Sequence, residues 1–291
     1  MGAIYNLDQD RPSFAGLHPF RKQLMTTESL GNRLLVACAV AREAGALQKR
    51  RFLGREAMIY KFKGPQDYLT ATDGDVEKLV RGQLLEAFPD DTFLGEEDGG
   101  QVSNRTWVVD PIDGTSNFAR GIPHFCVSIA FVFEAVASIG VIYQPILDEL
   151  YAAAKGLGAT LNGEPIKTSS TASLDKSLID VGRASRQPQD AYLAMLDKVM
   201  STGAAIRGAG SGALAIANVA AGRAEACFEA HMYPWDCLAG LVLVEEAGGR
   251  VNDFLAGDSL RKGGPILASA PGIAEELSAL LGVPLKLGET A

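Results

Sequence analysis

Residues 107–118 read Trp-Val-Val-Asp-Pro-Ile-Asp-Gly-Thr-Ser-Asn-Phe, and this stretch decides the expected fold and site. Its apolar start predicts the end of a buried strand, which delivers Asp110 into a turn that contains proline. Asp113 follows, Gly114 lets the backbone approach a ligand, and Thr115 begins a short helix. Carboxylates at a strand end bind a hard cation, and the N–H groups of a helix start bind an anion. The stretch therefore predicts a divalent cation beside a phosphate, although the same residue types also form ordinary turns.

The composition is that of a globular protein with a large core. The chain has 291 residues, of which 47% are hydrophobic and 21% are charged. No apolar run reaches the roughly 18 residues of a membrane-spanning helix, and no basic-then-apolar signal opens the chain. We therefore expect a cytoplasmic protein with no membrane partner. The net charge of −8 argues against direct binding of nucleic acid.

The periodicity of apolar residues divides the chain into three parts. Residues 1–25 are expected to form a loose arm, residues 26–165 an N-terminal α+β half, and residues 166–291 a C-terminal half in which strands and helices alternate. Turn-forming residues at 156–165 join the two halves. Helices are expected at 26–52, 73–89, 189–200, 213–221, 235–247 and 273–281. Strands are expected at 58–62, 92–94, 125–133, 138–143, 150–154, 178–181, 204–206, 225–228 and 266–268, with a short one near 251.

Three further segments place an acid at a strand end or a helix start. Asp73 follows Thr-Ala-Thr at a helix start, Glu96 and Glu97 follow a short strand, and Asp236 precedes an apolar helix. Taken singly, each has a plainer explanation as a helix cap or a solvated acid. Together they predict one crevice, because α/β layers place ligand sites at such ends. Carboxylates that meet there stay ionised only around cations, and two Mg²⁺ ions suit phosphoryl transfer to water.

At these segments the sequence resembles the inositol monophosphatase family, Mg²⁺-dependent and Li⁺-sensitive phosphatases related to fructose-1,6-bisphosphatases. The most specific matches are Asp-Pro-Ile-Asp-Gly-Thr at 110–115 and Trp-Asp at 235–236 ahead of an apolar helix. The other matching segments lie at 70–73, 95–97, 158–163, 207–213 and 245–249, in family order. The resemblance covers roughly residues 30–268 and implies a layered α/β/α/β/α sandwich of the sugar-phosphatase type.

The resemblance implies a ligand set for two to three Mg²⁺ ions. Glu96, Asp110 and the Ile112 carbonyl would hold the first ion. Asp110, Asp113 and Asp236 would hold the second, and a weaker third ion would lie near Glu96. Mn²⁺ is an alternative metal, and Li⁺ or Ca²⁺ would inhibit.

The resemblance also implies catalytic and substrate-binding residues. Asp73 and Thr115 would form a hydrogen-bonded pair that, with Glu96, deprotonates the attacking water. The N–H groups of Gly114 and Thr115, beside Asp113, would hold the phosphate. The hydroxyls of the substrate would meet four further residues, Gly210, Ser211, Gly212 and Glu229. A carboxylate such as Glu229 suits a polyol because it accepts two hydrogen bonds.

The expected reaction is hydrolysis of a small phosphate monoester, with inositol 1-phosphate as the first substrate. Histidinol phosphate, fructose 1,6-bisphosphate and NADP are alternatives within the family. The haloacid-dehalogenase motif fits less well, because the segment that imitates it at 73–77 ends in Glu. Histidine phosphatases also fit less well, since His18, His124 and His231 lack the Arg and Gly neighbours that such enzymes need.

Two questions stay open at this point. The first is a non-enzymatic role as an acidic partner of a protein complex, because some bacterial relatives of the family bind the transcription machinery. The second is the role of Lys61 and Lys63, which are offset from the lysine that family members often carry before the turn at Pro65. The family also implies a homodimer.

Overall fold

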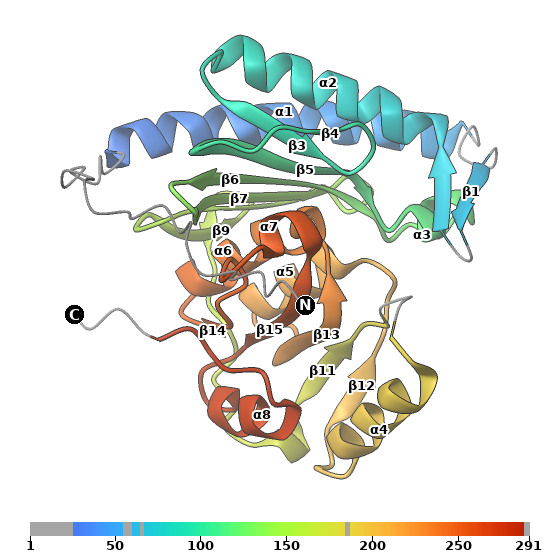
Figure 1. Ribbon diagram of the computed structural model, residues 1–291, viewed down its shortest axis with the longest axis vertical. Coiled ribbons are helices and arrows are strands. Elements are labelled where there is room, and N and C mark those ends of the chain that lie inside the picture. Colours follow the sequence, from blue (N-terminus) through green and yellow to red (C-terminus); the bar gives the residue numbers. More distant parts are fainter. Residues whose placement is uncertain (1–25, 55–59, 65–66, 184–186, 288–291) are drawn as a thin grey trace, which may run out of the picture.

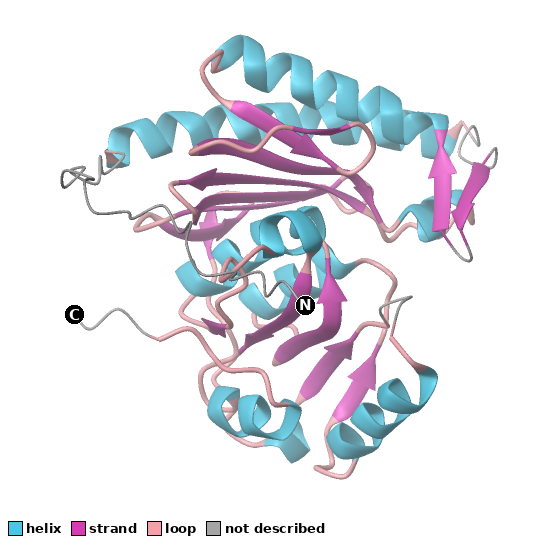
Figure 2. Ribbon diagram, viewed as in Figure 1, coloured by secondary structure: helices cyan, strands magenta, loops and turns pink. Residues whose placement is uncertain are grey.

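The computed structural model describes residues 26–54, 60–64, 67–183 and 187–287. The arm expected at 1–25, the first two residues of the strand expected at 58–62, and the turn at 65–66 lie outside the described residues. In the described part, two large sheets alternate with layers of helices (Figures 1 and 2). None of the described helices has the length and apolar character needed to cross a membrane.

The first sheet has eight strands in the described part of the chain. Its neighbours run antiparallel, apart from β3 and β5, which are parallel. In spatial order the strands are β10 (Glu164–Pro165), β9 (Gly158–Leu161), β8 (Glu149–Ala154), β7 (Val136–Gln144), β6 (Cys126–Phe133), β5 (Arg105–Asp113), β3 (Thr92–Gly95) and β4 (Gly99–Gly100).

The second sheet has five strands among the described residues and mixes parallel with antiparallel pairs. Its spatial order is β12 (Ala205–Arg207), β11 (Leu178–Val181), β13 (Ala226–Met232), β15 (Gly264–Ser269) and β14 (Arg250–Val251). A separate hairpin joins β1 (Tyr60–Gly64) to β2 (Asp67–Thr70).

The helices form three layers around the two sheets (Figure 1). Helices α1 (Thr27–Leu53) and α2 (Ala71–Ala87) cover the outer face of the first sheet, and α5 (Gly212–Ala220) and α6 (Pro234–Glu246) lie between the sheets. Helices α4 (Gln189–Met200) and α8 (Ala274–Leu281) cover the far face of the second sheet. The short helices are α3 (Thr115–Ala119), α7 (Ser259–Lys262) and the 3-10 turn η2 (Leu174–Lys176). This confirms the predicted α/β/α/β/α sandwich.

The apolar run in β5 is continuous because helices cover both faces of its sheet. Trp107 and Val109 pack in the cluster under α1 and α2, whereas Val108 packs in the cluster with α5 and α6. Helix α6 is apolar on all sides for the same reason, since it lies between the two sheets. One apolar cluster contains residues of both sheets, among them Ile142 and Ile266. The predicted boundary between two halves at residue 165 stays a prediction.

Two sequence expectations about local structure were wrong. The proline-containing turn expected after Asp110 is the irregular end of β5, where Asp110 pairs with Ser128, Asp113 pairs with Cys126, and the register shifts between them. A register shift accommodates Pro111 because the missing N–H is not needed in the ladder. The joining segment at 156–165 is a hairpin of β9 and β10 that extends the first sheet.

Candidate active site

Parallel pairing of β3 with β5 places two of the predicted ligands side by side. Gly95 lies opposite Val109, and the N–H of Glu96 donates to the Val109 carbonyl at 3.2 Å. The residues that follow, Glu96 and Asp110, are therefore neighbours, just after the end of β3 and near the carboxyl end of β5. Open α/β sheets bind ligands at this edge.

A hydrogen bond from the first sheet holds Asp236 at the same edge. Ser128 lies opposite Asp110 on β6, and its hydroxyl donates to the Trp235 carbonyl at 2.9 Å. Trp235 directly precedes Asp236 in the first turn of α6, and the Asp236 carboxylate accepts the Tyr233 N–H at 3.3 Å. Asp236 thus also has the capping role that its position at a helix start predicts.

Asp113 joins the first sheet to the start of α5. One carboxylate oxygen accepts from the Ser211 hydroxyl and from the Ala213 N–H at 2.8 Å, and the other accepts from the Gly212 N–H at 3.2 Å. A predicted ligand and two predicted substrate contacts therefore touch directly. The helix start is satisfied by an acid that lies about a hundred residues away in the chain.

Glu96, Asp110, Asp113 and Asp236 are called the acidic cluster below. Burial raises the pKa of Asp110 well above its usual range, and the other three charges, with a hydrogen bond that the protonated Asp110 carboxyl donates to Glu96, raise it further. Burial, Glu96 and Asp113 likewise raise the pKa of Asp236. Burial also raises the pKa of Asp113, against hydrogen bonds from α5 that lower it. The charges that contribute most to the shifts at Asp110 and Asp236 are all negative, so the cluster is destabilised unless a proton or a cation is added.

The carboxylates of the acidic cluster suit a divalent cation chemically, although oxygens of Asp113 and Asp236 accept hydrogen bonds from protein N–H groups. Within the described residues, no group of three or more His, Cys, Asp or Glu side chains is already arranged to hold a metal ion. The hydrogen bonds to Asp113 and Asp236 explain this, because they turn carboxylate oxygens toward N–H groups. The set itself consists of buried or half-buried carboxylates and the nearby Ile112 carbonyl, and such oxygen atoms are the ligands that Mg²⁺ prefers. The ligand roles stay predictions.

Asp73 lies in the first turn of α2 and reaches Thr115. One of its carboxylate oxygens accepts from the N–H and the hydroxyl of Thr70, at 2.8 and 2.5 Å, as in a capping box. The other lies 3.3 Å from the Thr115 hydroxyl, which is also 2.8 Å from the Ile112 carbonyl. Burial raises the pKa of Asp73 to about 6, with a smaller contribution from Glu97 and opposing hydrogen bonds from Thr70. The plain capping explanation and the predicted Thr115 contact therefore both hold geometrically.

Helix α3 is tied to the loop before α5. Gly114 caps α3 with φ 96°, a left-handed conformation that favours glycine. The Asn117 side-chain amide donates to the carbonyls of His124 at 2.8 Å and Ala209 at 2.9 Å. The sequence predicts Asn117 as a cap-type side chain of the short helix, but α3 has no side-chain cap and the contact of Asn117 with the loop was not expected. Its bonds hold the segment at 208–210 against the proposed phosphate site.

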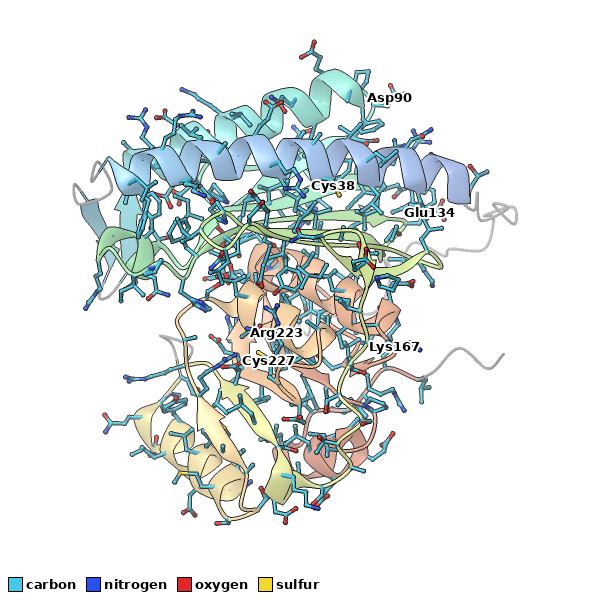
Figure 3. The ribbon with its side chains drawn as sticks, turned by 180° about the vertical axis from the view of Figure 1, so that it is seen from behind. Cys38, Asp90, Glu134, Lys167, Arg223 and Cys227 are labelled. Atoms are coloured by element: carbon cyan, nitrogen blue, oxygen red, sulfur yellow. The ribbon has the colours of Figure 1, made fainter. Side chains whose placement is uncertain are left out.

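A pocket of about 380 Å³ contains the predicted substrate contacts and is called the substrate pocket below. Glu229 reaches it from β13, and burial, with the charge of Asp113, raises the pKa of that carboxyl to about 7. Cys227, labelled in Figure 3, lines the same pocket. The remaining lining residues that matter here are Gly210, Ser211, Gly212, Asp180, Arg183 and Tyr192.

Glu77 is a site residue that sequence reasoning missed. Its fully buried carboxylate accepts from the N–H groups of Glu97 at 2.9 Å and Asp98 at 3.0 Å, and pairs with Arg81 at 2.9 Å. It therefore fixes the loop that carries Glu96. Its position four residues before Arg81 on a helix was the available signal, and that spacing is typical of a surface ion pair.

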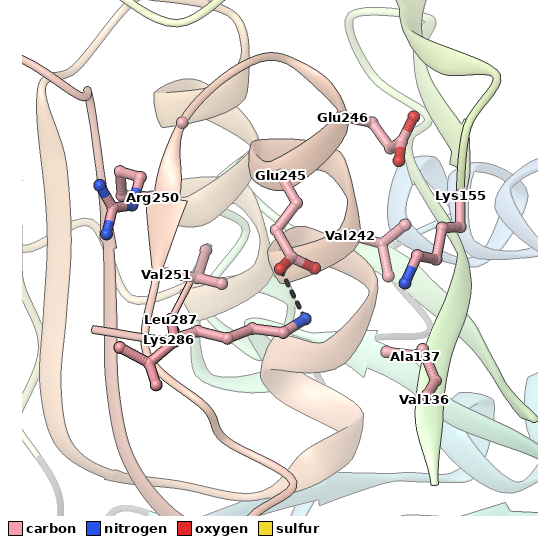
Figure 4. Close-up of a pocket in the computed structure, with 11 residues that line it drawn as sticks. Val136, Ala137, Lys155, Val242, Glu245, Glu246, Arg250, Val251, Lys286 and Leu287 are labelled. Carbon is pink, nitrogen blue, oxygen red and sulfur yellow. Dashed lines mark hydrogen bonds and ion pairs between the residues drawn. The ribbon is translucent and has the colours of Figure 1, made fainter. Parts of the chain in front are cut away.

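Another pocket lies between α6, β14 and the start of β7, and its charged groups are engaged (Figure 4). Lys286 pairs with Glu245 at 2.8 Å, and Glu246 accepts from the N–H groups of Gly156 and Gly158 at 2.9 and 2.8 Å. None of the predicted site residues lines it. Lys61 and Lys63 lie on β1, and their side chains are outside the described part of the structure.

Comparison with known proteins gives the same result for the sequence and the fold. The model of the inositol monophosphatase family matches residues 30–282. The Nus factor SuhB of Xylella fastidiosa is 41% identical over 224 residues, which cover 76% of this chain and 82% of that protein. The crystal structure of the extragenic suppressor protein suhB from Bartonella henselae has a TM-score of 0.79 at 36% identity, covering 85% of this chain and 97% of that one. The inositol monophosphatase of Anabaena has a TM-score of 0.76 at 38% identity, covering 88% and 97%.

Proposed function

The chain belongs to the inositol monophosphatase family, and we propose that it is a Mg²⁺-dependent phosphatase that hydrolyses a small phosphate monoester. Inositol 1-phosphate is the substrate we propose first. The observation that carries the proposal is the acidic cluster, because three separate segments supply its four acids and the repulsion among them raises the pKa values of Asp110 and Asp236. Divalent cations would relieve that repulsion and would attract a phosphate.

The proposed metal ligands are Glu96, Asp110, the Ile112 carbonyl, Asp113 and Asp236, for two to three Mg²⁺ ions. Mn²⁺ is proposed as an alternative, with Li⁺ and Ca²⁺ as inhibitors. When bound, Mg²⁺ neutralises phosphate charge, acidifies water and stabilises the oxygen that leaves. Binding would require Asp113 and Asp236 to share oxygens that now accept protein hydrogen bonds.

The proposed base is the pair formed by Thr115 and Asp73. The Thr115 hydroxyl would accept the proton of the attacking water and pass its own proton to Asp73, 3.3 Å away. For this step the hydroxyl must turn from the Ile112 carbonyl toward Asp73, and Glu96 would help to orient the water. The N–H groups of Gly114 and Thr115, at the start of α3, would hold the phosphate oxygens.

The leaving alcohol would lie in the substrate pocket. Ser211 and Gly212 already bond to Asp113, so an alcohol near Asp113 would lie between the metal ligands and the pocket. Glu229 would accept hydrogen bonds from two hydroxyls when it is ionised. Gly210 lines the same wall and would present its backbone.

Phosphate release from a panel of monoesters tests the proposal. The panel contains inositol 1-phosphate, histidinol phosphate, fructose 1,6-bisphosphate and NADP, each with Mg²⁺ and with a chelator. We expect Mg²⁺-dependent release that is highest with inositol 1-phosphate, and an Asp113→Asn variant slowed by at least about a hundredfold. Asp190→Asn is the control, because Asp190 is an exposed acid in the first turn of α4 and lies outside the acidic cluster and the substrate pocket. The proposal fails if none of the four substrates releases phosphate in the presence of Mg²⁺.

A second candidate function is suggested by the relatives whose name is Nus factor SuhB. On that reading the chain is an acidic partner in a protein complex and needs no turnover. Asp113→Asn separates the two candidates, since it would stop phosphate release and leave a complex intact. We also propose a homodimer by family likeness, which sedimentation of the full chain would test.

A further inference from the structure

We propose that the substrate pocket binds a second anionic group of the substrate through Arg183. The inference rests on the proposed phosphatase function and adds to its substrate class. Besides inositol 1-phosphate, the pocket would accept a polyol or sugar with one phosphate at the acidic cluster and another phosphate at Arg183.

Arg183 supplies a positive charge that the described protein leaves unpaired. Arg183 lines the substrate pocket and is exposed. No hydrogen bond or ion pair joins it to a described residue, and its recorded contact is with the Tyr192 ring, 5.9 Å from the guanidinium carbon to the ring centre. A cation over an aromatic ring is oriented without losing its hydrogen-bond donors.

Arg207, near the same wall, differs from Arg183 because its guanidinium is paired with a carboxylate. It donates two hydrogen bonds to the Asp180 carboxylate, at 2.8 and 2.6 Å. Asp180 is buried and lines the pocket, so its charge is neutralised by Arg207. Asp180 is therefore not the partner of Arg183.

Glu229 is a second charged side chain of the pocket that has no ion pair or hydrogen bond with a described residue. No ion pair joins it to Arg183, and no hydrogen bond of its carboxyl is present among the described residues. Arg183, which can bind an anion, and Glu229, which can accept hydrogen bonds from hydroxyls, therefore line one pocket without pairing with each other. A ligand that carries both hydroxyls and an anion would satisfy both groups.

A phosphate suits Arg183 better than a neutral group does. The planar guanidinium binds phosphate oxygens with two parallel hydrogen bonds, which a hydroxyl or an inositol ring cannot match. The pocket extends from Gly212, bonded to Asp113, to Arg183 and Tyr192. A substrate with phosphates at both ends would therefore span it.

The test compares fructose 1,6-bisphosphate with the two fructose monophosphates, in wild type and in Arg183→Gln. The wild type is expected to prefer the bisphosphate. Arg183→Gln should lower kcat/KM for the bisphosphate by about tenfold or more, chiefly through KM, and leave the monophosphates within about twofold. Arg183→Lys should retain part of the preference, since it keeps the charge and loses the fork.

Lys198→Gln is the matched control. Lys198 is exposed on α4, the helix of Tyr192, and does not line the pocket, so its loss should change all three substrates equally. Equal changes for the bisphosphate and the monophosphates in Arg183→Gln would overturn the inference and leave the phosphatase proposal intact. A preference of the wild type for the monophosphates would also overturn it. If the wild type released phosphate from none of the three fructose phosphates and not from inositol 1-phosphate, both the inference and the phosphatase proposal would be overturned.

Discussion

At the scale of single residues, the Asp113 carboxylate has two roles. Its carboxylate holds the N–H groups of Gly212 and Ala213 and the Ser211 hydroxyl, and it belongs to the acidic cluster. A cation that approached Asp113 would thus act on the start of α5 and on the substrate pocket at once. Asp73 and Asp236 likewise combine a capping role with a proposed role in the reaction. Capping and function are therefore not alternatives at these positions.

The pH dependence of substrate binding should follow Glu229. Burial and Asp113 raise the pKa of this carboxyl to about 7, so it gains a proton near neutrality as the pH falls. A protonated carboxyl accepts fewer hydrogen bonds, so KM for inositol 1-phosphate should rise as the pH falls from 8 to 6. Mg²⁺ at Asp113 would neutralise part of the repulsion and move the inflection below 7.

Steady-state kinetics of Glu229→Gln check this prediction. The variant should raise KM at pH 8 by about fivefold or more and flatten the KM profile between pH 8 and 6. Mg²⁺ half-saturation should stay unchanged. The same KM profile in variant and wild type would remove Glu229 from substrate binding.

At the scale of elements, the loop after β3 depends on one buried side chain of α2. Glu77 accepts from the N–H groups of Glu97 and Asp98 and pairs with Arg81, so the position of Glu96 depends on α2. Glu77→Ala should raise the Mg²⁺ concentration for half-maximal phosphate release several-fold, because Glu96 loses its fixed position. It should also cost about 1–3 kcal/mol of stability, since two N–H groups lose their acceptor.

Glu86→Ala is the control for Glu77, because Glu86 is exposed on the same helix. The two variants would be compared by Mg²⁺ titration of activity and by urea unfolding. If Glu77→Ala lost stability with no change in Mg²⁺ half-saturation, the loop would not depend on Glu77 for its function.

Helix α6, which carries Asp236, packs closely on the first sheet at Gly140. A Cβ added at Gly140 would overlap the Ala239 carbonyl, whereas a Cβ added at Gly82 on α2 would meet open space. Gly140→Ala should therefore destabilise the protein by about 1–3 kcal/mol. Gly82→Ala should stabilise it by up to about 1 kcal/mol, because alanine favours a helix more than glycine does. Urea unfolding measures both values, and a Gly140→Ala variant as stable as the wild type would contradict this packing.

The sequence predicted the main elements because their apolar residues follow a helix or strand period. For this reason the sequence alone revealed the apolar run before Asp110, and Asp236 just before the apolar part of α6. The strands β4, β9 and β10 were missed because they are short or built from turn-forming residues. The extension of β5 through Pro111 was missed because its pairing depends on a register shift.

The candidate site was partly predictable for a similar reason. Acids at strand ends and helix starts are visible in the sequence, and the structure brings Glu96, Asp110, Asp113 and Asp236 together. Glu77 and Arg183 were not singled out, because their importance depends on which distant backbone or pocket they face. Contacts of this kind join residues far apart in the sequence, so no regular spacing of residue types reveals them.

At the scale of the whole molecule, the fold concentrates negative charge between its two sheets. The acidic cluster draws on β3, β5 and α6, and Asp113 connects it to α5. The protein thus gives up stability at one place, because buried like charges repel. The central claim is that divalent cations restore this stability and that the restored state is the working one.

Thermal unfolding with and without Mg²⁺, at pH 8 and constant ionic strength, tests this claim most directly in the wild type and in Asp236→Asn. Mg²⁺ at ten times its Kd should stabilise the wild type by about 1.4 kcal/mol, or about 2–3 °C in Tm. Asp236→Asn should have the higher Tm without Mg²⁺, because one repelling charge is gone, and a smaller rise when Mg²⁺ is added. The account would be contradicted if the wild-type Tm did not change when Mg²⁺ was added, or if the Tm of Asp236→Asn rose by the same amount.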